Sequence, residues 1–115
     1  MERYVAAFER ADVDALTRLL TDDAVLEMPP MLNWYVGREA YGRFMERVFG
    51  QRGPDWRAVP IAANTQPGFA AYVRGEDGYR LHTLQIFTVT SAGISRATVY
   101  MDQAVFDIFE LPPRL

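Results

Sequence analysis

The pattern of hydrophobic and polar residues is clearest over residues 79–102, where Thr, Ile, Val, Phe and Tyr dominate and one cluster of small residues interrupts the run. This pattern predicts two long strands joined by a tight hairpin. A three-residue loop at 91–93 would place Thr90 opposite Ile94 and His82 opposite Asp102. A two-residue loop would instead pair Thr83 with Asp102, so the predicted pairs depend on the loop.

Both faces of this hairpin carry hydrophobic side chains. With the three-residue loop, one face includes Leu84 and Ile86, and the other includes Phe87 and Val99. A sheet with two such faces is not expected to leave either of them in water. One face should pack on helices of the same chain. The other should be covered as well, most simply by the sheet of a second copy, which predicts a homodimer.

The first part of the chain predicts helices. Hydrophobic residues recur at helical spacing over 2–20, with a bend where Asp12 can cap a second helix that starts at Val13. A polar turn at 21–23 and a short strand at 24–28 follow, and Pro29-Pro30 ends that strand. A loop at 31–36 then leads into a helix over about 38–49.

The second part predicts a sheet and a short closing helix. Strands are expected over 56–63 and 69–74, before the hairpin, and a helix over 103–109. Pro60 indicates that the first of these strands is an edge strand or contains a bulge. Helices followed by a curled antiparallel sheet define an α+β fold. In known folds of this kind, helices packed on a curved sheet form a cone with an internal pocket.

Composition narrows the function classes. A chain of 115 residues, half of them hydrophobic, is expected to form a single domain over residues 1–115. The formal net charge of −3 gives no electrostatic basis for binding nucleic acid. The chain has no cysteine and no hydrophobic run of the roughly 20 residues that a membrane span needs. We therefore expect a cytoplasmic protein that uses no disulfide and contacts no membrane.

Three stretches carry a family resemblance. The opening segment from Tyr4 to Pro30, the Trp34-Tyr35 pair with Gly37, and the strand at 81–90 together resemble a SnoaL-like domain. They are most similar to the version at the carboxyl end of some bacterial extracytoplasmic-function sigma factors. The resemblance implies the nuclear-transport-factor-two-like cone fold, which polyketide cyclases, ketosteroid isomerases and limonene epoxide hydrolases share. The promoter-binding sigma regions are not in this sequence, so we expect either a piece of a longer protein or a stand-alone relative.

The resemblance also suggests catalytic residues. Enzymes of the family place a carboxylate, often with a His, Tyr or Trp, in the hydrophobic cone, where desolvation raises the carboxylate pKa. Asp102 matches the strand-end aspartate of the family, with His82 or Tyr100 as proton donor. Each residue has a structural alternative: Asp102 can cap the closing helix, His82 can be a buried structural residue, and Tyr100 can bond the backbone.

Other residues are candidates for ligand binding. Hydrophobic and aromatic side chains near the expected pocket, together with one side-chain amide, could contact a ligand or simply pack in the core. These candidates are Met28, Trp34, Tyr35, Tyr41, Phe44, Tyr72 and Gln85. A single histidine without cysteine argues against a zinc site, and no phosphate-binding loop is present, so no cofactor or metal is predicted.

Two functions fit these observations, beside the simpler possibility of an ancestral enzyme scaffold that is kept only for dimerisation. The first is a ligand-binding or regulatory domain that takes a small apolar molecule and contacts sigma-factor regions or RNA polymerase. The alternative is a cofactor-independent acid/base enzyme, a cyclase or isomerase that acts on a small apolar carbonyl compound.

Overall fold

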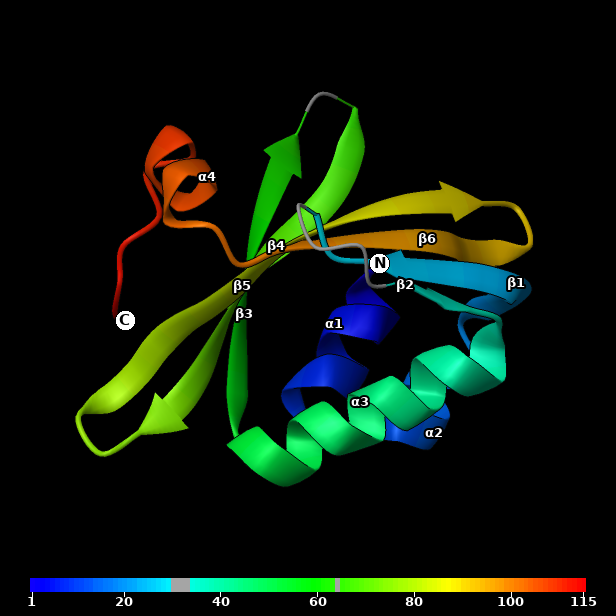
Figure 1. The fold of residues 1–115 in the computed structure, drawn as a ribbon, viewed down its shortest axis with the longest axis horizontal. Helices are drawn as coiled ribbons and strands as arrows, with labels where there is room; N and C mark the ends of the chain where they lie inside the picture. Colours follow the sequence, from blue (N-terminus) through cyan, green and yellow to red (C-terminus); the bar gives the residue numbers. More distant parts are fainter. Residues whose placement is uncertain (30–33, 64) are drawn as a thin grey trace.

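The computed structural model describes residues 1–29, 34–63 and 65–115. The chain forms, in order, α1 (Glu2–Glu9), α2 (Val13–Thr17), β1 (Leu20–Glu27), β2 (Trp34–Val36), α3 (Arg38–Arg52), β3 (Trp56–Ala63), β4 (Gln66–Gly75), β5 (Gly78–Thr90), β6 (Gly93–Tyr100) and α4 (Gln103–Ile108). The strands make one curved sheet in the order β2-β1-β6-β5-β4-β3. Figure 1 shows α1, α2 and α3 gathered on one side of this twisted sheet, with α4 near the C-terminus. The predicted α+β fold is confirmed.

The start of helix α2 is set by a local capping hydrogen bond. The Asp12 side chain accepts a hydrogen bond from the Ala15 backbone N–H at 3.1 Å and caps α2, as predicted. The second helix is shorter than expected, however, because residues 20–23 belong to β1. The expected helix end and polar turn at this place were wrong. β1 pairs in parallel with β6, and the Ile94 N–H donates to the Leu19 carbonyl at 2.9 Å, so a distant strand fixes this segment.

The predicted loop before α3 contains a strand. Leu26 pairs with Tyr35 and Glu27 with Trp34, which makes β2 an antiparallel neighbour of β1. Trp, Tyr and Val are residues that fit a pleated surface, and β1 offers them a free edge. At the other end of the sheet, Pro60 lies in the edge strand β3, as its missing N–H requires.

The hairpin between β5 and β6 has a two-residue turn, so the predicted three-residue loop was wrong. Thr90 pairs with Gly93, whereas Thr88 pairs with Arg96, which leaves Ser95 as an extra residue in β6. Gly93 has a φ of +131°, and a Cβ at this position would lie 2.6 Å from the Leu19 carbonyl oxygen. The turn therefore requires glycine both for its backbone conformation and for the close approach of β1.

The irregularity at Ser95 restores the predicted pairing over the rest of the hairpin. Leu84 pairs with Tyr100 and Gln85 with Val99. The two faces of the hairpin are consequently the predicted ones. β6 ends at Tyr100, so the ladder stops before the expected pair of His82 with Asp102.

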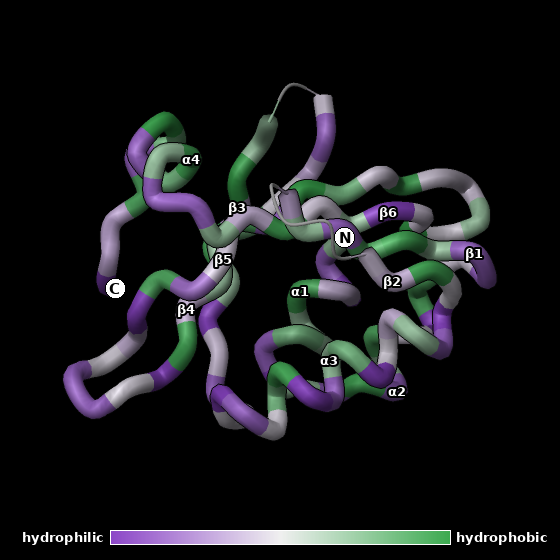
Figure 2. Tube along the Cα trace, viewed as in Figure 1, coloured by the Kyte–Doolittle hydropathy of each residue, from purple (hydrophilic) through white to green (hydrophobic). Residues whose placement is uncertain are grey.

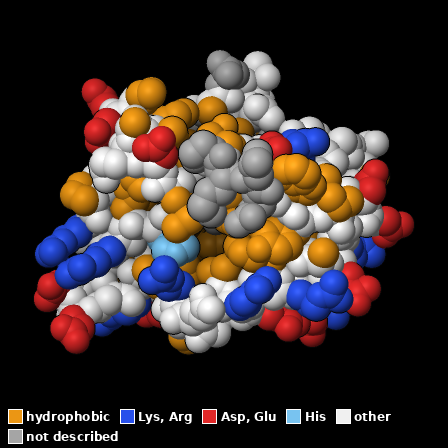
Figure 3. All heavy atoms as spheres, viewed as in Figure 1, with side chains coloured by type: hydrophobic (Ala, Val, Ile, Leu, Met, Phe, Trp, Pro, Cys, Tyr) orange, Lys and Arg blue, Asp and Glu red, His pale blue; other side chains and the backbone are white. Residues whose placement is uncertain are grey.

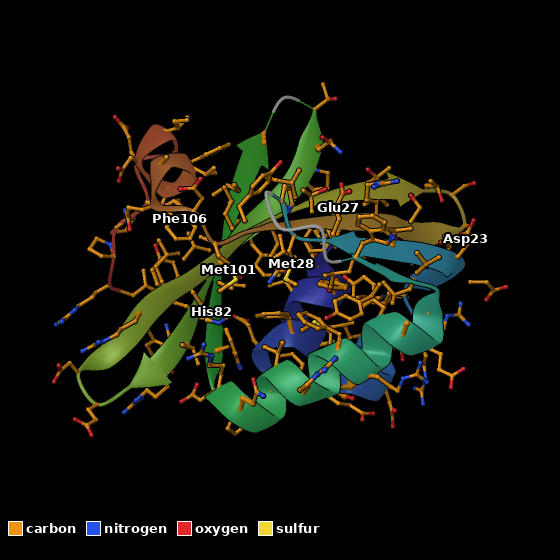
Figure 4. The ribbon with its side chains drawn as sticks, viewed as in Figure 1. Asp23, Glu27, Met28, His82, Met101 and Phe106 are labelled. Atoms are coloured by element: carbon orange, nitrogen blue, oxygen red, sulfur yellow. The ribbon has the colours of Figure 1, made fainter. Side chains whose placement is uncertain are left out.

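The main core lies between the helices and the inner face of the sheet. Phe8, Phe69 and Phe87 are fully buried there, and the hydroxyl groups of Tyr4 and Tyr41 share a buried hydrogen bond of 2.6 Å. A smaller cluster on the outer face brings Leu84 and Ile86 against Phe106 of α4, and Figure 4 shows Phe106 on that helix.

Hydropathy follows this arrangement. Figure 2 shows hydrophobic positions where the first helices meet the sheet, whereas the turn between β4 and β5 is hydrophilic. Among the helices of the described ranges, none combines the length and hydrophobicity that crossing a bilayer requires.

Candidate functional site

A cavity of about 200 Å³ lies between α3 and the inner face of the sheet. Most of its lining is hydrophobic. The lining residues are Phe8, Leu26, Met28, Phe44, Met45, Val48, Gln51, Arg52, Trp56, His82, Thr83, Gln85, Val99 and Met101. Figure 4 shows Met28, Met101 and His82 on the sheet side of this space. A concave, mainly hydrophobic site with a few polar groups has the properties of a small-molecule binding site.

His82 reaches the cavity because β5 is irregular at this point. Ala71 pairs with Thr83 and Tyr72 with Leu81, so His82 has no opposite residue on β4. In a regular strand His82 and Thr83 would point to opposite faces of the sheet. An extra residue breaks this alternation and can redirect a side chain. Both residues consequently line the same cavity.

Trp56 forms the wall beside His82. The two ring centroids are 5.2 Å apart, and the rings meet edge to face. The indole N–H of Trp56 donates to the Gly53 carbonyl at 2.7 Å, which fixes the orientation of the indole ring. The imidazole is therefore held against a rigid hydrophobic surface.

A pair of buried polar side chains lies on β5 next to His82. The Gln85 amide donates to the Thr83 hydroxyl oxygen at 3.0 Å, and both residues are at most 5% exposed. Within the described residues, no buried side-chain nitrogen or oxygen lacks a hydrogen-bond partner. Among the described residues no partner takes the Thr83 hydroxyl hydrogen or the Gln85 amide oxygen, so both groups can bond a molecule in the cavity.

The charge around the cavity is positive or neutral. Burial, together with the nearby positive charge of Arg52, lowers the pKa of His82 from 6.5 to about 4, so the imidazole is neutral at pH 7. Arg52 is exposed at the end of α3, and the described lining includes no Asp or Glu. Figure 3 shows the histidine beside hydrophobic side chains and next to basic ones.

Comparison with known proteins identifies the family. The sequence profile of the SnoaL-like domain matches residues 1–98. The chain belongs to the SnoaL-like domain family. This SnoaL-like domain is also 34% identical, over its whole length, to the ECF RNA polymerase sigma factor SigG of Mycobacterium tuberculosis. The chain spans 31% of the length of that relative.

Solved structures show the same fold. A putative polyketide cyclase from Xanthomonas campestris is similar with a TM-score of 0.66 and 20% identity, covering 91% of this chain and 89% of that one. A putative ketosteroid isomerase from Kribbella flavida has the same TM-score and identity, covering 88% and 73%. At this identity the similarity establishes the nuclear-transport-factor-two-like fold of the SnoaL-like domain, not its activity.

Four residues that the sequence singled out meet in the cavity of the SnoaL-like domain. They are Met28, Phe44, His82 and Gln85. Tyr35 is not part of the described lining, but its ring stacks on the lining residue Phe44 with centroids 4.5 Å apart. Trp34 is 59% exposed.

The other predicted residues lie elsewhere. Tyr41 is in the main core, bonded to Tyr4. The Tyr72 hydroxyl donates to the Pro112 carbonyl at 2.7 Å, near the C-terminus. Tyr100 packs with the smaller cluster on the outer face of the sheet.

Asp102 is exposed and caps α4. Its side chain accepts a hydrogen bond from the Ala104 N–H at 2.9 Å, which is the structural alternative recognised in the sequence. Of the three residues suggested as catalytic, only His82 lines the cavity. Within the described ranges, no group of three or more His, Asp or Glu side chains is arranged to hold a metal ion.

Sequence reasoning missed more than half of the lining. Some of the missed residues are hydrophobic ones that the pattern assigns only to the core, such as Phe8 and Val99. Arg52 could have been found, because it follows Phe44 and Val48 at intervals of four residues on the same face of α3. No local signal marks Thr83, whose neighbour His82 shares its side of the strand only through the irregularity in β5.

Proposed function

We propose that this SnoaL-like domain binds a small, mostly hydrophobic molecule in the cavity and acts as a regulatory domain of an extracytoplasmic-function type of sigma factor. The observation that carries the proposal is the hydrophobic cavity with the Thr83–Gln85 pair on one wall. These two side chains offer one donor and one acceptor to a polar group of a ligand. The identity to SigG over the full chain supports the regulatory setting.

The cavity proposal is tested by titration with octanamide, a neutral molecule with a hydrophobic chain and one polar end. Binding should shift the NMR signals of the Trp56 indole N–H and the Gln85 side-chain amide. The substitution Val99→Phe replaces an isopropyl group by a phenyl ring in the cavity. Octanamide affinity should fall at least about tenfold because the space is filled.

Val59→Phe is the matched control, because Val59 is 38% exposed on edge strand β3 and does not line the cavity. Its octanamide affinity should equal that of the wild type. Circular dichroism checks that both variants fold. Absence of any shift at Trp56 and Gln85 at millimolar octanamide would refute the cavity proposal.

The partner is proposed from the same relationship. We expect the domain to contact the promoter-binding sigma regions and to pair with a second copy through the outer face of the sheet. On that face Trp34 and Val36 are both about 60% exposed, and α4 covers Leu84 and Ile86. Covering the exposed side chains in a partner would bury hydrophobic area.

Sedimentation velocity checks both contacts. The domain alone should sediment as a dimer, and its sedimentation coefficient should rise when purified sigma regions of SigG are added. Trp34→Ser should weaken the dimer, whereas Val89→Ser, whose side chain is 48% exposed on the helix side of the sheet beside α1, serves as the surface control. A monomer at hundreds of micromolar would contradict the dimer, and an unchanged coefficient on mixing would contradict the sigma contact.

The described cavity lining gives little support to the alternative, an acid/base enzyme. A carboxylate base would have to act inside the cavity, and Asp102 is committed to its cap at the surface. We therefore do not extend the proposal to cyclase or isomerase activity.

A further inference from the structure

We infer that the cavity selects small hydrophobic molecules that carry an anionic group, and that Arg52 binds this group at the cavity rim. The inference rests on the proposed function, because it specifies which molecules the cavity takes. It assigns the contact with the ligand's negative charge to Arg52. The charge preference of the cavity and the effect of substituting Arg52 can each be measured separately from the binding of a neutral ligand.

Arg52 is the only charged side chain among the described residues that line the cavity. Within the described ranges it forms no ion pair with an acidic side chain. The five residues outside these ranges include no Asp or Glu, so they supply no counter-charge to the cavity. A guanidinium beside a hydrophobic cavity without a counter-ion favours an anion from outside.

The other three arginines of α3 differ from Arg52 in their surroundings. Arg47 holds its guanidinium over the Phe44 ring, 5.9 Å from the centroid, and does not line the cavity. Arg38 pairs with Asp22 at 3.2 Å and also donates to the Leu20 carbonyl at 2.7 Å. Arg43 pairs with Glu39 at 2.8 Å, one turn earlier on the same helix. These two arginines already have oxygen partners at the surface. Arg52 combines an uncompensated charge with a position on the cavity.

A position in the last turn of α3 gives Arg52 a structural role as well. A cation near a helix C-terminus interacts favourably with the helix dipole. That role depends on charge alone and gives no preference between ligands. Ligand selectivity therefore separates the binding role from the structural one.

The positive charge of Arg52 acts on His82, which lies on the sheet side of the cavity. Arg52 contributes to the lowered pKa of His82, so the two groups interact electrostatically. A ligand carboxylate between them would form charge-assisted hydrogen bonds with the guanidinium. It would also offset the effect of Arg52 on the imidazole and raise the pKa of His82.

The dimensions limit the ligand. A volume of about 200 Å³ is below the roughly 300–1,000 Å³ of pockets for drug-sized molecules. Met28, Met45 and Met101 line the space, and flexible thioether side chains adapt to chains of different shape. A short aliphatic or monocyclic acid matches both the size and the charge.

The test compares three probes with the same seven-carbon alkyl chain: octanoate, octanamide and heptylammonium. Calorimetric titration of the full chain at pH 7 and low salt should give an affinity order in which octanoate binds about tenfold more tightly than octanamide. Heptylammonium should bind more weakly than octanamide, because Arg52 repels it. Added salt should reduce the advantage of octanoate.

The substitution Arg52→Gln should reduce the preference for octanoate over octanamide to less than about threefold, because the guanidinium that binds the anion is removed. Arg43→Gln is the matched control, since it removes the same charge from the same helix away from this cavity, and it should keep the full preference. In wild-type protein, the NMR-detected pKa of His82 should rise with octanoate and not with octanamide.

The outcomes are distinguishable. If octanamide binds and octanoate binds no more tightly, the anion inference fails and the cavity proposal stands. If Arg52→Gln keeps the preference, Arg52 is not the anion partner and the inference is overturned. If no probe binds, the proposed function fails together with the inference. A change in thermal stability of Arg52→Gln, without a change in preference, would leave only the structural role and would also overturn the inference.

Discussion

The substitution Phe8→Ala is expected to lower the free energy of unfolding by about 3–5 kcal/mol. Phe8 is 1% exposed, and its ring lies 5.0–5.4 Å from the rings of Phe49, Trp56 and Phe69. Truncation removes the ring's burial and leaves a void, since three rigid aromatic neighbours from α3, β3 and β4 cannot all move into the space. Urea unfolding followed by circular dichroism measures this loss.

Ile108→Ala is the matched control for this prediction. Ile108 is 77% exposed on α4, so its truncation should change the free energy of unfolding by no more than about 0.5 kcal/mol. A cost below 1 kcal/mol for Phe8→Ala would show that α1 is not anchored in the core by this ring. Phe8 also lines the cavity, so octanamide affinity should fall in any folded Phe8→Ala protein whose cavity has rearranged.

Local signals in the sequence predicted the local features of the fold. Asp12 was predicted to cap a helix, and a cap was the structural alternative for Asp102, because a carboxylate that precedes a helical run accepts its free N–H groups. Pro60 indicated an edge strand because it lacks the N–H that a central strand needs. The alternation of residues 79–102 gave the two faces of the β5–β6 hairpin.

The features that failed depend on distant partners. Residues 21–23 look like a polar turn, yet they belong to the start of β1 because β6 lies beside this strand in the sheet. Trp34 and Tyr35 follow two prolines, and only the free edge of β1 makes them a strand. Propensity is a weak guide where strand pairing between distant segments decides the outcome.

The candidate site was predictable only in part, for two physical reasons. Tyr41 and Phe44 lie on the same hydrophobic side of α3, yet Tyr41 is bonded in the core and Phe44 lines the cavity, so helical spacing does not separate them. His82 faces the cavity through an irregularity in β5 that no residue type announces. The family resemblance predicted that a cavity exists, and the structure was needed to decide which side chains line it.

Acid is expected to destabilise the domain through His82. In the unfolded chain the imidazole takes up a proton near pH 6.5, whereas in the folded domain its pKa is about 4. Between these values the unfolded state binds more protons than the folded state, so the free energy of unfolding falls as the pH falls. The contribution is fully present above pH 6.5 and is lost progressively down to about pH 4, by about 3 kcal/mol in total.

Because His82 is the only histidine of the chain, His82→Gln isolates this contribution. Urea unfolding at several pH values between 7.5 and 4 should show a steeper loss of stability for the wild type than for His82→Gln, and the two curves should run parallel above pH 6.5. The described charged side chain that faces the ring in the cavity is Arg52, so Arg52→Gln should raise the pKa of His82 and reduce the slope. Parallel curves over the whole range would mean that the imidazole titrates as it does in water, and that neither burial nor Arg52 acts on it.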